Sequence, residues 1–192
     1  MVDEIYTVNE NTMAFIPFYD GEGKIKTNIL EVEDFKDSQL TPIELVDRNL
    51  RFFGSSLKGA SEGTRYVLGE VNMYPVIMNL KHQLVWFPTI SPKKNDCVWL
   101  ALNHIKSYKK NKNQSTEILF TNGSSLTIEV RFSSFDRRIN RACALKFRLD
   151  YRSKFMLIPP SVQKNFLKYS IIKDDNDINY QIHTKNEDSL DN

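Results

Sequence analysis

The sequence predicts an α+β fold, mainly antiparallel β-sheet with one short and one long helix. Between residues 13 and 130, short apolar segments alternate with turn residues, as expected for strands joined by hairpins. From about residue 135 to residue 152, the apolar positions instead recur with the 3.6-residue period of a helix. Because the strands come first and do not alternate with helices, antiparallel pairing is favoured over a parallel sheet.

The first expected elements are a hairpin and the short helix. Residues 13–18 form a strand, the turn signal Asp20-Gly21-Glu22-Gly23 follows, and residues 24–32 return as a second strand. A helix is then expected over residues 42–50, with Thr41 as its N-cap and Pro42 in its first turn. A threonine side chain caps a first turn well, and proline fits its first position.

Turn residues divide the middle of the chain. Gly54, Gly59 and Gly63 predict a loop, and the basic, Asn-rich residues 106–114 predict an exposed connection. Asn122-Gly123 is a strong hairpin signal between the last two strands. The runs typical of strands are residues 66–71, 76–78, 83–87, 98–105, 117–120 and 125–130.

Composition indicates one intracellular domain. Leu, Ile, Val and Phe make up 56 of the 192 residues, which excludes disorder throughout the chain. We expect a single domain over residues 1–178 and an acidic, flexible tail over residues 179–192. No apolar stretch is long enough for a membrane span, and the acidic start Met1-Val2-Asp3-Glu4 is unlike a secretory signal. The protein is therefore expected in the cytoplasm, with Cys97 and Cys143 reduced.

The net charge of +2 conceals a strong segregation of charge. Residues 1–47 carry 3 basic against 11 acidic side chains, a balance of −8. Residues 48–154 carry 19 against 7, a balance of +12, and residues 155–192 carry 4 against 6, a balance of −2. The basic middle predicts a polyanionic partner, while a mixed, solvated surface is the alternative.

The long helix has arginines along one side. Six of the nine arginines of the chain lie between residues 131 and 152. At about 100° per residue, Arg137, Arg148, Arg141 and Arg152 fall in one stripe. The opposite, apolar side comprises Phe135, Ile139, Ala142, Cys143 and Leu149, with Lys146 among them. Ser133 and Asp136 are expected to form a capping box. Because aligned like charges repel, the stripe favours polyanion binding over a purely structural role, although a plain charged surface is the alternative.

Arrangements of residues that would indicate an enzyme are absent. The three histidines and two cysteines lack the spacing of zinc ligands, so neither a metal nor another cofactor is expected. Ser55-Ser56-Leu57-Lys58 matches a Ser-x-x-Lys pattern without its companion motifs. His104 lies in a predicted strand, where a structural histidine is the expected interpretation.

Three segments resemble the competence transcription factor (ComK) family of low-GC Gram-positive bacteria. They are Val46-Asp47-Arg48-Asn49-Leu50-Arg51-Phe52-Phe53-Gly54-Ser55-Ser56, then Pro75-Val76-Ile77-Met78 with Phe87-Pro88-Thr89-Ile90-Ser91, and Phe155-Met156-Leu157-Ile158-Pro159. The resemblance implies a DNA-binding transcriptional activator of DNA-uptake genes, associated with the nucleoid. Its implied partners are paired A/T-rich boxes read through the minor groove, a second copy of the chain in a dimer or higher oligomer, and RNA polymerase.

The candidate DNA contacts combine this resemblance with the basic side chains. Arginine suits the enhanced negative potential of a narrow, A/T-rich minor groove. The candidates are Arg137, Arg141, Arg148 and Arg152, with Arg138 and Lys146 on the same helix, Lys109, Lys110 and Lys112 on phosphates, and Arg48, Arg51 and Lys58 ranked second.

Two further motifs have two readings each. Phe52-Phe53-Gly54-Ser55-Ser56 is interpreted mainly as two buried aromatics followed by a glycine turn. Phe155-Met156-Leu157-Ile158-Pro159 resembles the segment by which the family docks a proteolytic adaptor, and a core strand is the alternative. Ile158 stands where the family pattern has an aromatic, and Pro160 replaces a basic residue.

Two other function classes compete with duplex binding. Trp86, Phe87, Trp99 and Tyr108 could form a stacking platform for RNA or single-stranded nucleic acid. A partner-binding module would instead use the acidic N-terminal part of the chain. A preference for A/T-rich duplex would separate duplex binding from both of these alternatives.

Overall fold

Two antiparallel sheets form the framework of the first part of the chain. The computed structural model describes residues 6–79, 81–156, 168–173 and 180–185, and divides the chain into units 1–150 and 151–192. In the first unit, the larger sheet has the strand order β3-β2-β1-β6-β5-β4 and the smaller has the order β7-β8-β9. The strands are β1 (Thr12–Tyr19), β2 (Ile25–Glu31), β3 (Phe35–Ser38), β4 (Val76–Asn79), β5 (Leu84–Pro88), β6 (Trp99–Ala101), β7 (Ile105–Lys110), β8 (Thr116–Phe120) and β9 (Ser125–Ile128).

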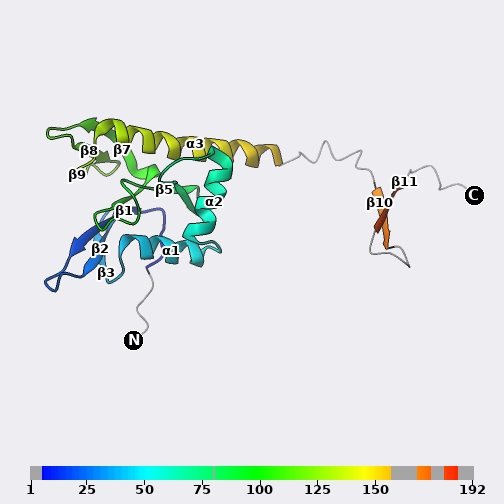
Figure 1. The fold of residues 1–192 in the computed structure, drawn as a ribbon, viewed down its shortest axis with the longest axis horizontal. Helices are drawn as coiled ribbons and strands as arrows, with labels where there is room; N and C mark the ends of the chain where they lie inside the picture. Colours follow the sequence, from blue (N-terminus) through cyan, green and yellow to red (C-terminus); the bar gives the residue numbers. More distant parts are fainter. Residues whose placement is uncertain (1–5, 80, 157–167, 174–179, 186–192) are drawn as a thin grey trace, which may run out of the picture. The chain divides into compact units, whose positions relative to one another are not determined.

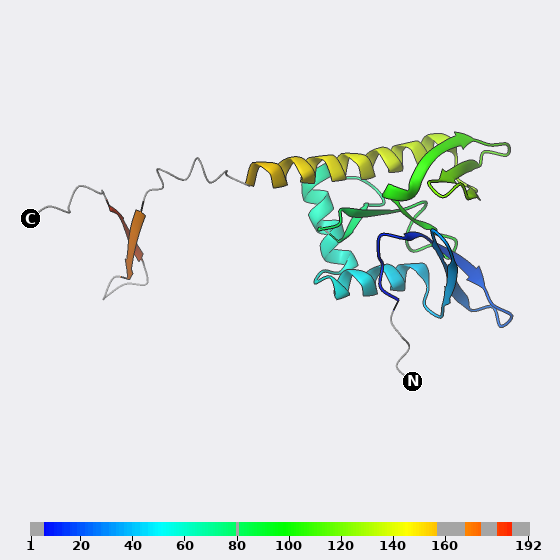
Figure 2. The same cartoon turned by 180° about the vertical axis from the view of Figure 1, so that it is seen from behind.

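Helices cover both faces of the larger sheet, which confirms the predicted α+β class. They are α1 (Pro42–Phe52), α2 (Leu57–Leu68) and α3 (Phe132–Met156). Helices α1 and α3 lie on opposite sides of the sheets, and α2 spans the space between them at one end (Figure 1 and Figure 2). Successive residues of β5 therefore enter different cores: Val85 and Phe87 pack with α3, whereas Trp86 packs with α1.

Locally encoded elements form as predicted. Thr41 caps α1 in a complete capping box with Glu44, and Pro42 begins the helix. The β1–β2 hairpin closes through Asp20, whose carboxylate accepts hydrogen bonds from the Glu22 and Lys24 amides. The β8–β9 hairpin turns at Gly123, where φ is +89°. Each signal lies within a few residues of the structure that it determines.

The predicted loop at Gly54, Gly59 and Gly63 is wrong beyond its first residue. Gly54 makes a turn with φ of +84°, but Gly59 and Gly63 lie inside α2, which Ser56 caps by accepting from the Gly59 amide at 3.1 Å. The strand predicted over residues 66–71 is wrong for the same reason, because its first half is the end of this helix.

Three other boundaries differ from the prediction. The run 98–105 is broken by a 3-10 turn, Leu102–His104, where the chain leaves the larger sheet for the smaller. Residues 106–110 form most of β7 and are not a loop. Helix α3 begins at Phe132, so Ser133 lies inside it and the predicted capping box is wrong. Strand β3, at the edge of the larger sheet, is an unpredicted addition.

The second unit contains a short hairpin. Strands β10 (Lys168–Lys173) and β11 (Tyr180–Lys185) pair antiparallel, with Ile171 opposite Ile182. Strand β11 lies within the tail predicted over residues 179–192, and the proposed division at residue 178 stays a prediction.

Candidate nucleic-acid interface

The arginine stripe of α3 is present, and its members make different contacts. Arg137, Arg148 and Arg152 are exposed, and Arg141 is half-buried. The Arg137 guanidinium donates to the Ser133 carbonyl one turn earlier, at 3.3 Å, so this contact stays within α3. The Arg137 side chain thus lies along an exposed surface of α3.

Arg148 instead reaches the end of α2, and Arg141 reaches the loop that follows it. Arg148 Nη1 donates to the Val67 carbonyl at 2.6 Å, and Arg141 Nη1 donates to the Asn72 carbonyl at 2.8 Å. The last carbonyls of a helix lack partners within it and carry partial negative charge. Arg148 therefore stabilises the C-terminus of α2 as well as presenting a charge.

Replacing Arg148 by alanine should lower the free energy of unfolding by about 1 kcal/mol, because Val67 loses a charged donor. Arg137→Ala, on the same helix, removes no contact between elements and should cost less than about 0.5 kcal/mol. Urea denaturation of the two variants measures the difference. Equal stabilities would show that the Arg148 contact does not hold α2.

The buried side of α3 largely follows the prediction. Phe135, Ile139 and Ala142 are buried against both sheets, and Leu145 joins them. Lys146 is half-buried and its ammonium group reaches Asn103 Oδ1 at 3.2 Å. Cys143 is exposed, so its predicted place on this side is wrong: it lies beyond the arc of the helix that the sheets cover.

Arg138 lies apart from the exposed stripe. It is half-buried, and its Nη2 lies 3.5 Å from Met73 Sδ. The pKa of its guanidinium is lowered, mainly by burial. Among the candidate contacts on α3, it is the one most enclosed by protein.

The predicted lysine group is divided by the strand that carries it. Successive side chains of a strand face opposite sides. Lys110 shares its side of β7 with Tyr108, whose ring packs against Phe135 of α3. Lys109 faces the other side and pairs with Glu117 at 3.3 Å. Lys112, in the following turn, is exposed.

This turn lies beside the first residues of α3. Arg131, immediately before the helix, donates to the Gln114 side chain at 2.7 Å, and the Tyr108 hydroxyl donates to Asp136 at 2.7 Å. Lys110 of β7, Lys112 of the turn after it and Arg137 of α3 are exposed basic residues of these two neighbouring elements, a set we call the α3–β7 basic face.

The second-ranked candidates lie around the start of α2. Arg48 and Lys58 are exposed, while Arg51 forms an ion pair with Asp47 at 2.7 Å. Asp47 also accepts from the Leu57 amide at 2.8 Å, the first residue of α2. The Leu57 amide first, and Arg51 next, hold the pKa of Asp47 below its usual range. Asp47 thus connects α1 to α2.

Asn49 is another polar residue of the segment Val46 to Ser56, and its role is structural. Its side chain is 1% exposed, accepts from the Val8 amide at 2.7 Å and donates to the carbonyls of Leu45 at 2.9 Å and Tyr6 at 3.2 Å. It fastens the segment before β1 onto α1. The motif therefore has structural polar residues, Asp47 and Asn49, beside exposed basic ones.

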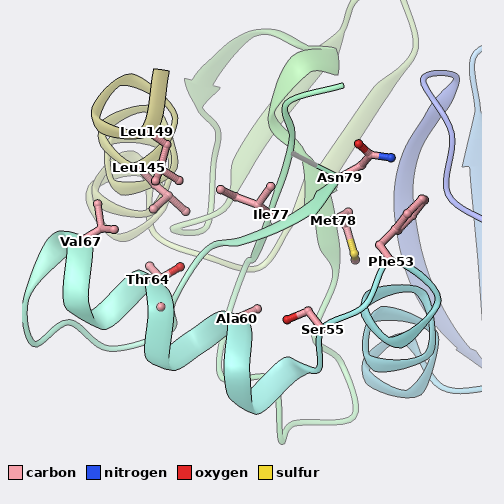
Figure 3. A pocket seen from close by; sticks show the side chains of 11 residues that line it. Phe53, Ser55, Ala60, Thr64, Val67, Ile77, Met78, Asn79, Leu145 and Leu149 are labelled. Atoms are coloured by element: carbon pink, nitrogen blue, oxygen red, sulfur yellow. The ribbon is translucent and has the colours of Figure 1, made fainter. Parts of the chain in front are cut away.

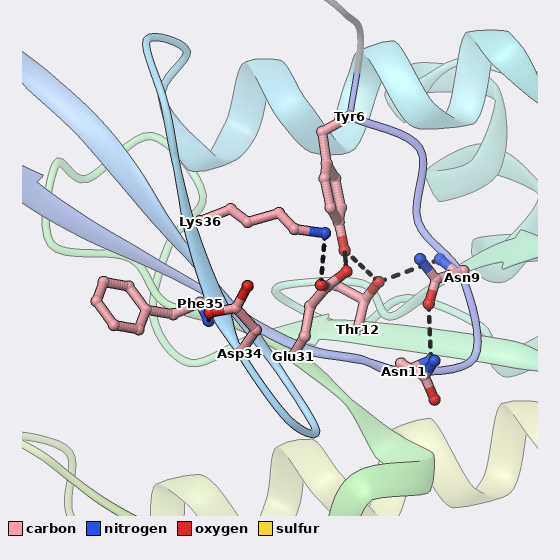
Figure 4. Close-up of polar contacts among 8 residues, drawn as sticks. All are labelled: Tyr6, Asn9, Asn11, Thr12, Glu31, Asp34, Phe35 and Lys36. Atoms are coloured by element: carbon pink, nitrogen blue, oxygen red, sulfur yellow. Dashed lines mark hydrogen bonds and ion pairs between the residues drawn. The ribbon is translucent and has the colours of Figure 1, made fainter.

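A second polar cluster secures the same N-terminal segment (Figure 4). The Tyr6 hydroxyl donates to Glu31 Oε1 at 2.6 Å and lies 2.6 Å from Thr12 Oγ1. Lys36 binds the other Glu31 oxygen at 2.7 Å. Burial, and then the bond to Glu31, raises the pKa of Tyr6, so its phenol remains a proton donor.

Asn49→Ala should lower the free energy of unfolding by about 3 kcal/mol, because it leaves a buried amide and two carbonyls without their partner. Asn140→Ala is the matched control: Asn140 is exposed and bonds to Asp136 within α3, so about 0.5 kcal/mol is expected. Chemical denaturation of both variants measures the two losses in the free energy of unfolding. Similar losses would contradict the anchoring role of Asn49.

The four aromatics considered as an alternative stacking platform for single strands do not form one. Trp86, Trp99 and Phe87 are at most 1% exposed and pack in the cores, because their strands are central in the larger sheet. Tyr108 is half-buried, and burial first, then Asp136, raises its pKa to about 12. These four aromatics cannot present a surface on which bases stack.

The prediction that both phenylalanines of the motif are buried is also wrong. Phe52 is 64% exposed at the end of α1, on the side away from the core, and meets the half-buried Phe53 edge to face at 5.1 Å. His104 has a structural role: its Nε2 lies 2.7 Å from the Glu10 carbonyl and its Nδ1 lies 3.3 Å from Thr121.

An apolar groove of about 450 Å³ lies beside α2 (Figure 3). Its walls include Val67 of α2, Ile77 and Met78 of β4, and Leu145 and Leu149 of α3. Within α2 the one buried residue is Thr64, whose hydroxyl donates to the Pro75 carbonyl at 2.8 Å. Polar contacts therefore help to hold α2 in place, beside the packing of its partly buried apolar side chains.

The predicted adaptor-docking segment cannot be compared with the structure. The side chains of Phe155 and Met156, and all of Leu157, Ile158 and Pro159, lie outside the described residues. Over the described part of the chain, no group of His, Cys, Asp and Glu is arranged to hold a metal. Among those residues, no helix combines the length and apolar character of a membrane span.

The comparisons with known proteins identify the family. The sequence matches the ComK protein family over residues 3–154. The chain belongs to the ComK family. It is 31% identical over 179 residues to the competence transcription factor of Bacillus subtilis strain 168, covering 89% of this chain and 93% of that protein. No solved structure matches.

Membership of the ComK family confirms the resemblance carried by the three segments, and the match is much wider than they are. The protein is a regulator of transcription in competence. The ComK match ends at residue 154, close to the end of α3, so it includes every basic candidate of this interface.

Proposed function

We propose that the protein is an activator that binds duplex DNA at paired A/T-rich boxes, through the minor groove, and switches on genes for DNA uptake. Two or more copies bind one site. The α3–β7 basic face and the exposed arginines of α3 supply the contacts.

One observation carries this proposal: an arginine series, with Arg137 and Arg148 exposed, on a helix that has no acidic residue between Arg137 and Leu149. A surface helix that is merely solvated mixes charges of both signs. The chain otherwise prefers lysine, with 17 lysines and 9 arginines. The planar guanidinium suits phosphate oxygens and the narrow minor groove of A/T-rich DNA.

Shape also favours this mode of binding. From Arg137 to Arg148, α3 rises about 16 Å at about 1.5 Å per residue. About five base pairs of B-DNA occupy that length, at about 3.4 Å each. An exposed, basic helix edge of this extent can follow one backbone or line a minor groove.

Fluorescence anisotropy tests the proposal with two labelled duplexes of equal length, one holding two A/T boxes and one rich in G and C. At least ten-fold tighter binding to the A/T duplex is expected, about 1.4 kcal/mol, with a steep salt dependence. Equal binding to both duplexes would overturn the sequence preference. Tighter binding to RNA or a single strand would overturn the duplex itself.

A proteolytic adaptor is a further proposed partner. The run Phe155-Met156-Leu157-Ile158-Pro159 is the proposed docking segment, on the resemblance of its sequence alone. A peptide of residues 150–165 should retain the adaptor in a pull-down. A peptide of the same composition in scrambled order is the control, and equal retention of both would contradict the assignment.

A further inference from the structure

Arg138 is a half-buried cation that has no counter-ion among the described residues. Its Nε and Nη1 atoms have no accessible surface and no hydrogen-bond partner among the described residues. The remaining nitrogen, Nη2, meets the weak acceptor Met73 Sδ at 3.5 Å. Burying an unsatisfied charged group is costly, so this arginine lowers the stability of the fold in this state.

The titratable groups around Arg138 do not relieve that cost. They are the Cys97 thiol and the guanidinium groups of Arg137 and Arg141. Burial raises the pKa of Cys97 to about 11, so the thiol is neutral at pH 7, and the two arginines repel Arg138. Among the described residues none of the three guanidinium groups forms an ion pair with a carboxylate, which is the chemistry of an anion site.

A loop covers this position. Residues 69–74 belong to the connection between α2, which ends at Leu68, and β4, which begins at Val76. They meet α3 through Met73, against Arg138, and through the Asn72 carbonyl, which accepts from Arg141. Met73 has φ of +59°, a strained conformation for a residue with a side chain. The acidic residue of the loop, Glu70, pairs with Arg65 of α2 and leaves Arg138 without a carboxylate.

We propose that Arg138, flanked by Arg137 and Arg141, is the inner ligand of a phosphate site, and that residues 69–74 cover it until a phosphate binds. The atoms without accessible surface can reach a ligand only if a segment packed on this side chain moves, and the loop contacts the guanidinium through Met73. Arg141 would then exchange the Asn72 carbonyl for a phosphate oxygen, a stronger, charge-assisted partner. This inference deepens the proposed function and rests on it for the source of the phosphate.

Arg138→Met is the decisive variant, because methionine has similar length and suits an apolar environment. We expect its unfolding midpoint to rise by about 3 °C, its affinity for the duplex to fall about ten-fold and its salt slope to fall by about 1. Arg131→Met is the control: Arg131 is exposed and bonded to Gln114, so its midpoint should not rise and its affinity should change less than three-fold. A lowered midpoint for Arg138→Met, or affinity within two-fold of wild type, would overturn the proposal.

Two further arms identify the source of the phosphate. Inorganic phosphate at constant ionic strength, or the duplex, is added while the midpoint and the hydrogen exchange of residues 69–74 are followed. A raised midpoint with faster loop exchange, in the wild type but not in Arg138→Met, supports the site. It assigns a free phosphate if inorganic phosphate suffices and the DNA backbone if the duplex is required.

Absence of both effects with either addition overturns the proposal. The proposed function fails separately, if the wild type shows no preference for the A/T duplex. The comparison of Arg138→Met with wild type on any duplex then still decides the phosphate site.

Discussion

Replacing Lys110, Lys112 and Arg137 together by alanine should weaken binding to A/T-rich duplex about a hundred-fold at about 0.15 M salt. Each phosphate contact contributes about 0.9 to the slope of log affinity against log salt, so three contacts contribute about 2.7. Extrapolated from 1 M salt, that slope corresponds to about two powers of ten. All three side chains are exposed, so the fold should be unaffected. Anisotropy titrations at four salt concentrations measure both quantities.

The control removes the same number of charges elsewhere. Lys24, in the β1–β2 turn, and Lys93 and Lys94, in the loop after β5, are exposed and lie outside the α3–β7 basic face. Both triple variants change the net charge from +2 to −1. If the effect depends on net charge alone, the two variants weaken binding equally and the assigned face is wrong. If the slope of log affinity against log salt falls by less than 1 in the control, the assignment of the α3–β7 basic face is supported.

Local chemistry explains which elements could be predicted from the sequence. The cap Thr41, with Pro42 behind it, determines the start of α1, and Gly123 determines a turn, through contacts within four residues. Helix α2 was missed because Gly59 and Gly63 lower its intrinsic propensity. Its remaining signal was the cap at Ser56, before apolar residues at helical spacing.

Contacts distant in sequence hold α2 in place, and no local pattern encodes them. Asp47 binds its first amide, ten residues earlier in the chain, and Arg148 binds the Val67 carbonyl across 81 residues. The arginine periodicity was legible because a helix repeats regularly. Which arginines donate to a carbonyl of α2 or of the loop after it depends on where α2 lies, so it required the structure.

Strand β7 also depends on contacts between residues distant in sequence, which no local pattern encodes. Its lysines predicted an exposed basic segment, which is correct for Lys109 and Lys110, but not that a strand separates them onto opposite faces. The residues of β7 carry no helix signal, and apolar and polar residues alternate only weakly along the strand. Its aromatic residue, Tyr108, faces α3. The pairing with β8, which fixes the register, is a tertiary contact.

Phe135→Ala should have the largest effect on stability, lowering the free energy of unfolding by about 4 kcal/mol. Phe135 is fully buried, and its ring lies 5.9 Å from Phe87 of β5 and 5.1 Å from Tyr108 of β7. The two neighbours belong to different sheets. Removing the ring leaves a cavity where α3 joins them, and the loss is a large part of the about 5–15 kcal/mol that stabilises an ordinary domain.

Phe147→Ala separates this role from the general cost of losing an aromatic ring. Phe147 lies on the same helix and is 70% exposed, so about 0.5 kcal/mol is expected from the identical substitution. Urea denaturation followed by circular dichroism compares the two. If Phe135→Ala costs less than about 1.5 kcal/mol, α3 does not join the sheets. The helix carrying the arginines would then be positioned mainly by its polar contacts to α2, and Arg148→Ala would become the more damaging substitution.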